Sequence, residues 1–279
     1  MKHSNQKTWF ITGASKGLGL ALATKLLNEG YAVAATSRNS KNFPEVLLQN
    51  QDFLALQTDL SDENSIRNSV EQTVNHFGKI DVVVNNAGYG IGGAIEELSE
   101  TEISQSFDVN VFATLKVIKS VMPHLRAQRS GHIINISSIA GFAAATGWAV
   151  YAAVKFAVVG LSEVLAEDVK EFGIHVTVVE PGAFRTQFLS SESLVLAQNP
   201  IEDYTEIRKS HERYASFDGA QIGDPDKAAS VFIDLVKNPN PPIRLFLGSD
   251  AFNRATEKVS ILSDDLQNWK AVSISTDFN

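Results

Sequence analysis

Short apolar runs recur along the first two thirds of the chain, and most are followed by longer segments in which apolar residues repeat every three or four positions. The short runs lack the polar alternation of a half-exposed sheet, which is typical of parallel strands buried on both faces. The longer segments have the spacing of amphipathic helices. Six strands are predicted here, at residues 8–12, 32–36, 53–57, 81–84, 132–136 and 174–179.

Signals for helix ends lie between these strands. Gly30 and Gly173 would close the first and the last helix, Ser61 or Asp62 would cap the second, and Pro123 would bend the third. The predicted helices cover residues 17–29, 62–77, 103–129 and 150–172. This alternation predicts an α/β fold with a doubly wound open sheet and right-handed crossovers. Ligands on such sheets bind beyond the carboxyl ends of the strands.

The pattern changes after residue 182. Residues 184–221 mix polar residues with scattered aromatics and are predicted to form a long substrate loop with one or two short helices. Asp224 and Pro225 then begin another helix, as N-cap and first helical residue. Two C-terminal elements complete the prediction, a strand at 243–247 and a helix at about 250–270.

Composition and charge exclude several classes of function. The chain has 279 residues, 44% of them hydrophobic and 20% charged, and no repeat or linker divides it, so one domain over residues 1–279 is predicted. A net charge of −8 without a dense basic run argues against a nucleic-acid partner. No apolar run approaches the ~20 residues that span a bilayer, and residues 1–7 have no apolar signal core, which favours a cytoplasmic protein without a membrane partner. Because there is no cysteine and the six histidines are scattered, we expect neither a disulfide nor a metal site.

The most informative chemical pair is Tyr151 and Lys155, with Ser138 thirteen residues before the tyrosine. Four residues is just over one helical turn, so the phenol and the ammonium share one helix face. A phenol has a pKa of about 10, and a neighbouring positive charge lowers it. With a hydroxyl donor nearby, the pair is suited to exchange a proton with a carbonyl or an alcohol. Taken alone, Tyr-x-x-x-Lys also arises by chance and decides nothing.

A glycine-rich turn lies between the first strand and the first helix, where a phosphate-binding turn belongs. Glycines let the backbone approach a pyrophosphate closely, and the start of the helix offers free N–H groups. The predicted nucleotide contacts in this turn are Gly13, Ser15, Lys16, Gly17, Leu18 and Gly19. The spacing differs from G-x-G-x-x-G, and an ordinary glycine-rich turn is the alternative interpretation.

The end of the second strand should meet the adenosine ribose of a dinucleotide. A carboxylate there would bond the 2′-hydroxyl, whereas a basic residue accommodates a 2′-phosphate. Ser37 and Arg38 stand at this position without an acid, and Lys16 adds a second cation nearby. These residues favour NADP(H) over NAD(H). The alternative for Arg38 is a solvated loop cation.

Five motifs follow one another in a fixed order. They are Thr12-Gly13-x-x-x-Gly17-x-Gly19, Asn85-Asn86-Ala87-Gly88, Ser138, Tyr151-x-x-x-Lys155 and Pro181-Gly182. In these motifs and their spacing, over residues 8–186, the chain resembles a short-chain dehydrogenase/reductase of the NAD(P)-dependent type. The resemblance implies a Rossmann fold with a seven-stranded parallel sheet, and hydride transfer between nicotinamide and a small carbonyl or alcohol substrate.

The resemblance also implies roles for individual residues. Ser138 would hold the substrate oxygen, Tyr151 would exchange a proton with it, and Lys155 would lower the pKa of the tyrosine and bond the nicotinamide ribose. Asn110 would hold a water that connects to Lys155. Tyr151, like Lys155, is also an implied cofactor contact. The others are Asp59 and Leu60 near the adenine, Asn86, Ala87 and Gly88 behind the cofactor, and Pro181, Gly182 and Thr186 at the nicotinamide.

The chain departs from the family pattern in two places. Val154 stands where a serine most often precedes the lysine, and we expect its side chain to pack rather than react. Residues 247–251 and the helix after them resemble members related to 17β-hydroxysteroid and retinol dehydrogenases. This longer tail leaves both a homodimer and the family's usual homotetramer open.

Two classes of function remain. One is an NADP(H)-dependent oxidoreductase acting on a carbonyl or secondary alcohol, and the other is a non-catalytic NADP(H)-binding regulator or sensor on the same fold. The presence of Ser138, Tyr151 and Lys155 favours the enzyme. Four aromatic residues flank the catalytic segments and hint at an apolar pocket, although core packing explains any one of them: Phe142, Trp148, Phe184 and Phe188.

Overall fold

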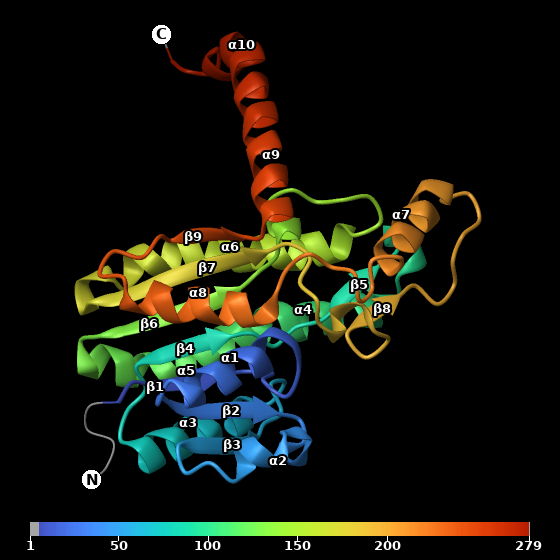
Figure 1. Cartoon of the computed structure of the whole chain (residues 1–279). Coiled ribbons are helices and arrows are strands. Elements are labelled where there is room, and N and C mark those ends of the chain that lie inside the picture. The colour runs from blue at the N-terminus through green and yellow to red at the C-terminus, as the bar shows by residue number, and fades with distance from the viewer. Residues whose placement is uncertain (1–5, 279) are drawn as a thin grey trace.

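Seven parallel strands form one twisted sheet in the computed structural model, which describes residues 6–278 (Figure 1). The strand order is β3-β2-β1-β4-β6-β7-β9, so the winding direction reverses between β1 and β4. The strands are β1 (Thr8–Ile11), β2 (Ala32–Ser37), β3 (Phe53–Gln57), β4 (Val82–Asn85), β6 (Gly131–Ile136), β7 (Ile174–Pro181) and β9 (Arg244–Leu247). The predicted Rossmann-type sheet of seven parallel strands is confirmed, and each predicted strand agrees with these bounds within two residues.

Helices cover both faces of the sheet. The helices are α1 (Gly17–Asn28), α2 (Glu45–Leu48), α3 (Glu63–Phe77), α4 (Glu100–Phe107), α5 (Ala113–Gln128), α6 (Ala149–Asp168), α7 (Thr205–Ala215), α8 (Pro225–Lys237), α9 (Ser249–Asn268) and α10 (Lys270–Ile274). Residues from α1 and α8 form one buried cluster with the sheet, and residues from α3, α5 and α6 form a second cluster on the opposite face.

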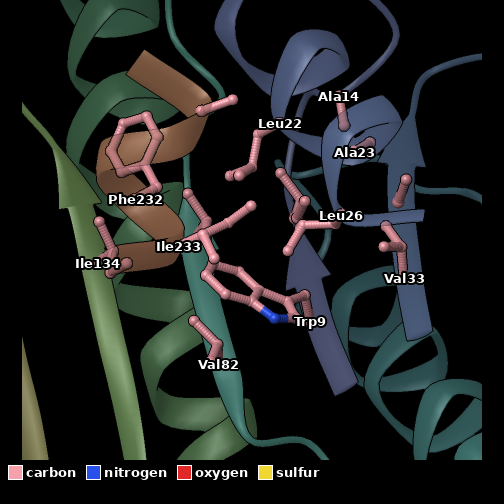
Figure 2. Close-up of a cluster of buried hydrophobic side chains, with 14 of the residues drawn as sticks. Trp9, Ala14, Leu22, Ala23, Leu26, Val33, Val82, Ile134, Phe232 and Ile233 are labelled. Atoms are coloured by element: carbon pink, nitrogen blue, oxygen red, sulfur yellow. The ribbon is translucent and has the colours of Figure 1, made fainter. Parts of the chain in front are cut away.

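Strand β1 shows why the apolar runs have no polar alternation. Trp9 and Ile11 belong to the cluster with α1 and α8, whereas Phe10 between them belongs to the cluster with α3 and α5. Figure 2 shows Trp9 enclosed between α1 and α8. Consecutive strand residues point to opposite faces, so a strand covered on both sides needs an apolar residue at every position.

The prediction of one continuous α-helix at 103–129 is wrong, because the structure has two α-helices joined by a π-helical turn. Helix α4 begins earlier, behind a capping box in which Ser99 accepts from the Glu102 N–H and the Glu102 carboxylate accepts from Ser99. Between α4 and α5 the chain adopts a π-helical turn over Asp108–Phe112, with Asn110 at its centre. Such turns occur mostly as single insertions in α-helices, often at functional sites. No local sequence pattern indicates this insertion.

Residues 184–221, here called the lid, are more ordered than a substrate loop. They contain the 3₁₀ turn Gln187–Leu189, strand β8 (Leu194–Leu196) and α7. Strand β8 pairs in parallel with β5 (Gly90–Gly92), which leads away from the carboxyl end of β4. This small second sheet was not predicted, because three-residue strands carry too little pattern to stand out. It attaches the lid above the carboxyl edge of the main sheet (Figure 1).

One expectation about membranes needs correction. Helix α6 has 20 residues and is apolar enough, by length and composition, to cross a membrane. Half of its apolar window is buried inside the fold, and the helix packs against β7 and carries Tyr151 and Lys155. A buried core helix meets the same criterion. The cytoplasmic location expected from the sequence stays a prediction.

Candidate active site

Ser138, Tyr151 and Lys155 converge beyond the carboxyl end of β6. Ser138 lies two residues after this strand, and Tyr151 and Lys155 lie one turn apart on α6. The hydroxyl of Ser138 lies near that of Tyr151 and acts to lower the pKa of the phenol. The Lys155 Nζ lies 5.7 Å from the centroid of the Tyr151 ring and donates to the Ile136 carbonyl at 3.1 Å. The arrangement places a hydroxyl, a phenol and an ammonium side by side.

The two adjacent serines have different partners. The Ser137 Oγ is buried and donates to the Lys155 carbonyl at 2.9 Å, which ties α6 to the end of β6. The Ser138 Oγ accepts from the Ala140 N–H at 3.1 Å and faces Tyr151. The structure therefore brings Ser138 to the tyrosine, as its spacing in the sequence implied, and gives Ser137 a structural bond. Val154 is fully buried, in agreement with packing.

Burial dominates the protonation of this pair. Tyr151 and Lys155 are 7% and 5% exposed. Burial raises the pKa of Tyr151, and the hydrogen bond from Ser138 works against that rise. Burial also lowers the pKa of Lys155, to about 8. The resemblance implies that Lys155 lowers the pKa of Tyr151, but the net shift of this pKa is upward. The largest cause is the removal of the phenol from water, and the Lys155 ammonium lies over the ring.

Asn110 packs against the backbone of Gly88 and Tyr89, next to Lys155. Its side chain is 1% exposed, accepts from the Tyr89 N–H at 3.2 Å and donates to the Ser106 carbonyl at 3.0 Å. A Cβ on Gly88 would lie 2.6 Å from the Asn110 Oδ1 and 3.4 Å from the Lys155 Nζ. Only a glycine fits between these two side chains, so Asn110, Gly88 and Lys155 form one packed unit.

The glycine-rich turn has the conformation that its glycines predict. Gly13 and Gly17 have φ values of +63° and +60°, in the left-handed region that favours glycine. A Cβ on Gly13 would lie 2.8 Å from the Ala87 Cα, and one on Gly19 would lie 2.6 Å from the Asn86 Nδ2. The turn is thus pressed against the segment that follows β4.

Asn86 and Thr12 hold this turn in place. The Asn86 Nδ2 donates to the carbonyls of Thr12 and Gly13, each at 3.0 Å. The Thr12 Oγ1 accepts from the backbone N–H groups of Asn86 and Ala87 at 3.0 and 3.1 Å. These bonds explain why Asn86, Ala87 and Gly88 belong with the nucleotide turn although they are some 70 residues away in sequence.

The start of α1 fits a phosphate. Its N-cap, Lys16, makes no side-chain bond to the helix and so leaves the first N–H groups uncapped by its own side chain. A helix start with free N–H groups attracts anions. Gly17 and Leu18 supply the first helical residues, and the Ser15 hydroxyl accepts from Ser37 at 3.2 Å. The residues present therefore fit the pyrophosphate of a dinucleotide.

The residues predicted near the adenosine differ in whether their side chains already have bonding partners. Arg38 is exposed at the end of β2, and no hydrogen bond or ion pair holds it among residues 6–278. Lys16 pairs with Glu192 of the lid, with its Nζ 3.2 Å from the carboxylate. Asp59 accepts from the N–H and hydroxyl of Ser61 at 2.8 and 2.7 Å, and these bonds lower the pKa of its carboxyl. Leu60 packs partly against the core. Of the two predicted cations, only Arg38 is free.

The segment after β7 is tied to the start of the C-terminal helix. The Gly182 N–H donates to the Leu247 carbonyl at 2.9 Å, next to Pro181 in the ladder with β9. The Asp250 Oδ2 accepts from the Ala183 N–H at 2.8 Å, and its carboxylate lies against Gly182, where a Cβ would be 2.2 Å away. Asp250 lies in the segment 247–251 noted above, but no role was predicted for this residue.

Thr186 lies on the far side of the nucleotide turn. Its Cβ would be 3.7 Å from a Cβ on Gly17. Its Oγ1 accepts from the Phe188 N–H at 3.3 Å and starts the 3₁₀ turn of the lid. Thr186 thus joins the glycine-rich turn, the segment after β7 and the lid at one point.

Only two of the four aromatic residues predicted to flank the catalytic segments pack against Tyr151. Phe188 and Trp148 pack against Tyr151, with ring centroids 5.9 and 6.3 Å away. Tyr214 of α7, which was not predicted, packs against Trp148 at 5.1 Å. The other two rings pack elsewhere: Phe142 stacks with Phe246 at 5.2 Å, and Phe184 packs against the cluster between α1 and α8.

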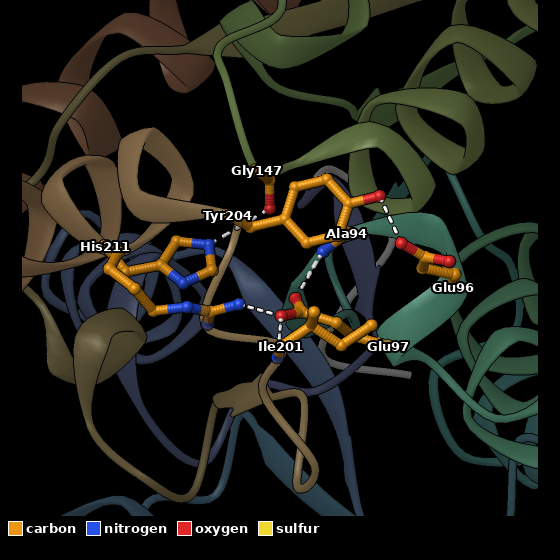
Figure 3. A network of polar contacts seen from close by, with 8 residues as sticks. Ala94, Glu96, Glu97, Gly147, Ile201, Tyr204 and His211 are labelled. Atoms are coloured by element: carbon orange, nitrogen blue, oxygen red, sulfur yellow. Dashed lines mark hydrogen bonds and ion pairs between the residues drawn. The ribbon is translucent and has the colours of Figure 1, made fainter.

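A buried carboxylate fastens the lid to the body (Figure 3). The Glu97 side chain has no exposed surface, accepts from the Ala94 and Ile201 N–H groups at 2.7 Å each, and forms an ion pair with Arg208 of α7. Ile201 and Arg208 lie more than 100 residues from Glu97 in the sequence. An acidic pair at residues 96–97 also has the usual pattern of solvated surface, so this contact was not predicted. Glu96 remains on the surface and binds only the Tyr204 hydroxyl.

We expect Glu97→Gln to loosen the lid. A neutral amide keeps the shape but loses the charge that Arg208 and the two N–H groups stabilise, and charged hydrogen bonds contribute about 1.5–3 kcal/mol each. Hydrogen exchange should speed up in residues 201–215 and not in β1. Glu96→Gln is the control, because it removes a neighbouring carboxylate with one exposed partner. Equal exchange rates in both variants would show that Glu97 does not hold the lid to the body.

A hollow of about 480 Å³ lies elsewhere, on the outer side of the lid between Ile95, Ala149 and Tyr204. It contains none of the residues predicted for catalysis or cofactor binding, so the chemistry is assigned to the buried region around Tyr151. Among residues 6–278, no group of three histidine or acidic side chains could hold a metal ion, and the absence of a metal site stays a prediction.

Comparison with known proteins places the chain in a family. The short chain dehydrogenase family matches residues 7–194. The chain belongs to the short-chain dehydrogenase/reductase family. It is 35% identical to oxidoreductase BOA17 of Botryotinia fuckeliana, over 97% of this chain and 99% of that one. It is 37% identical to 3-ketodihydrosphingosine reductase of Bacteroides thetaiotaomicron, over 85% and 86% of the two chains.

Solved structures of short-chain dehydrogenases agree with this membership. A short-chain dehydrogenase from Streptomyces avermitilis has a TM-score of 0.91 and 34% identity, covering 98% of this chain and all of that one. ElxO, solved with NADP bound, has a TM-score of 0.73 and 26% identity, covering 89% and 99%. The protein is therefore an NAD(P)-dependent dehydrogenase/reductase.

Proposed function

We propose that this short-chain dehydrogenase/reductase uses NADP(H) to interconvert a carbonyl and a secondary alcohol on an apolar small molecule, with Tyr151 as the general acid and base. The observation that carries the proposal is the placement of Ser138 and Lys155 beside the buried phenol of Tyr151, against which Phe188 of the lid packs. Measurement of NADPH oxidation across a panel of ketones and aldehydes tests it. The support is geometric, since a donor, an acid and a cation meet at the sheet edge where such ligands bind.

Each residue has a defined task in the proposed reaction. Nicotinamide supplies or accepts the hydride when bound. Ser138 donates a hydrogen bond to the substrate oxygen and orients it, while Tyr151 transfers the single proton to the same oxygen. Lys155 stabilises the phenolate that Tyr151 becomes, because it stays mostly protonated at pH 7 with a pKa of about 8. Asn110 and Gly88 pack the segment on which Lys155 rests.

The protonation of Tyr151 supports carbonyl reduction as the main direction at neutral pH. Burial raises the pKa of this phenol, so it is protonated and ready to donate. Alcohol oxidation needs the phenolate, which becomes more abundant as pH rises. The lid adds to this preference by covering the phenol with aromatic rings that exclude water.

An apolar substrate is supported by the surroundings of Tyr151. Its neighbours form a hydrophobic cluster with Trp148, Ile91 and Leu194, and the lid supplies part of it. A relative with 37% identity is named for reduction of 3-ketodihydrosphingosine, which is a ketone. We therefore place ketones with extended apolar groups first in the panel.

The proposed preference for NADP(H) depends on Arg38, because Lys16 is already paired with Glu192. We expect Arg38→Asp to lower the ratio of kcat/KM for NADPH to that for NADH by about 10-fold or more, since one charge-assisted contact contributes about 1.5–3 kcal/mol. Lys41→Asp is the control, because it changes the charge of a lysine just after β2 without replacing the residue at the strand end. An unchanged ratio in Arg38→Asp would remove the role given to this arginine.

A further inference from the structure

The C-terminal helix α9 stands away from the body of the molecule (Figure 1). Only its first turns are anchored: Ala251 and Ala255 are buried against Ile139. All residues from Val259 to Phe278 are exposed. A free helix of this length gains nothing from packing along its outer part, and isolated helices are marginal in water. Its apolar side chains therefore call for a partner.

The exposed apolar side chains follow a seven-residue repeat. Phe252, Val259 and Leu266 are spaced by seven, and Ala255, Leu262 and Trp269 follow each of them by three. This 3-4 spacing is the a and d pattern of a coiled coil. The seam is open: Phe252, Val259, Leu262, Leu266 and Trp269 are 63%, 56%, 40%, 72% and 62% exposed.

The charges around the seam decide which partner fits. Between residues 249 and 268 the helix has four acidic and two basic side chains, and the chain as a whole has a net charge of −8. A helix that lies on a membrane carries Lys and Arg on its polar face. The excess of acidic residues on this helix is a poor match for an anionic bilayer. The positions that flank the seam, Lys258 and Asp265, have opposite charges and can pair with each other between two copies.

We propose that α9 is a dimerisation arm that pairs with α9 of a second copy of this chain in an antiparallel coiled coil. One register pairs Phe252, Val259, Leu262 and Trp269 with one another, and Leu266 then meets the other copy where Ala255 joins its body. This register sets Val259 of one copy against Leu262 of the other, and Phe252 against Trp269, and it brings Lys258 of each copy beside Asp265 of the other.

The antiparallel direction follows from how the helix leaves the body. A parallel pair would bring the two bodies together at Ala255, whose surface is already covered by its own body. An antiparallel pair places the bodies at opposite ends of the arms. It also covers Phe252, which is exposed at the base of the arm, with Trp269 from the tip of the other copy. The inference stands apart from the proposed reaction.

The test replaces seam residues by aspartate and measures mass by light scattering. Leu266 is exposed in the single chain, so the Leu266→Asp variant should fold with an unchanged circular dichroism spectrum and Tm. The mass should fall twofold relative to the wild type. Ile261→Asp is the matched control, since it makes the same change at a 47% exposed position off the seam, and its mass should stay that of the wild type. A monomeric wild type, or equal masses in wild type and Leu266→Asp, would overturn the proposal.

Cysteine crosslinking tests whether the two helices pair antiparallel. Because the chain has no native cysteine, only the introduced residues can form disulfides. An equal mixture of Phe252→Cys and Trp269→Cys proteins should form mixed disulfide dimers on oxidation. Leu266→Cys alone should form none, because antiparallel pairing holds the two copies of residue 266 apart. Dimers of Leu266→Cys without mixed dimers would refute the antiparallel pairing.

Vesicle binding tests a membrane as the alternative partner of the apolar seam. Wild-type protein should stay in the supernatant when phosphatidylcholine vesicles are sedimented. Sedimentation with the vesicles that is lost in Leu266→Asp would assign the seam to a membrane and overturn the dimer.

Discussion

Tyr151→Phe is expected to lower kcat for carbonyl reduction by about 100- to 10,000-fold, the range that a positioned general acid contributes. The variant keeps the ring that packs against Trp148 and Phe188 and loses only the hydroxyl that Ser138 contacts. The affinity for NADPH should change little, because the predicted phosphate and ribose contacts lie on other residues. Steady-state NADPH oxidation and fluorescence titration of NADPH measure the two effects.

The matched control is Tyr31→Phe. Tyr31 packs beside Trp9 at the amino end of the sheet, away from the catalytic edge, so removal of its hydroxyl should leave kcat unchanged. A Tyr151→Phe variant that keeps more than about a tenth of wild-type turnover would contradict the assigned role. If the wild type binds NADPH tightly but turns over no carbonyl or alcohol in a broad panel, the regulator interpretation gains instead.

Ser137 and Ser138 offer a second comparison within the same experiment. Ser138→Ala should reduce kcat, because the hydroxyl that faces Tyr151 is lost. Ser137→Ala removes the bond to the Lys155 carbonyl and should act mainly on stability. An equal loss of kcat with unchanged stability in both variants would remove the distinction.

Arg244→Leu is expected to destabilise the protein by about 3–5 kcal/mol at pH 8, the cost of leaving a buried charge without its partner. Glu180 is completely buried in β7, and the Arg244 Nε lies 3.1 Å from its carboxylate. The same guanidinium lies 4.9 Å from the Phe142 ring centroid and bonds Glu163 at 2.9 Å. Chemical denaturation at several pH values measures the effect.

The loss should shrink at low pH. Burial raises the pKa of Glu180 from 4.5 to about 7, while Arg244 works in the lowering direction. A carboxyl with a raised pKa binds its proton more tightly when folded, so its contribution to stability declines as pH rises from about 4.5 to 7. Without Arg244 the pKa rises further, and at pH 5 the carboxyl is neutral and needs no partner.

Two further variants make the argument specific. Glu180→Gln/Arg244→Leu should lose most of the pH dependence, because the buried titrating group is gone and only the half-exposed Glu163 remains. Glu163→Gln removes the half-exposed partner of Arg244 and should cost less than about 1 kcal/mol. A loss in Arg244→Leu that is the same at pH 5 and pH 8 would show that packing on Phe142, and not the buried charge, makes this arginine important.

Local rules predicted the sheet well. Strands such as β1 and β4 are buried on both faces, so most of their positions are apolar and the run is visible in the sequence. The glycine-rich turn was predictable for the same reason, since Gly13 and Gly17 adopt φ values that other residues avoid. The π-helical turn at Asn110 was not, because it depends on bonds to Tyr89 and Ser106 rather than on residue type.

The sequence alone thus determined the order of strands and helices, the nucleotide turn and the family, because these depend on periodicity and on short motifs. The tertiary structure alone decided the rest. It sends Ser137 to the backbone of α6 and Ser138 to Tyr151, buries Glu97 against Arg208 of the lid, and raises the pKa of Tyr151 by removing it from water. Each of these depends on contacts between residues far apart in the chain, where burial and partner geometry, rather than residue type, set the energy.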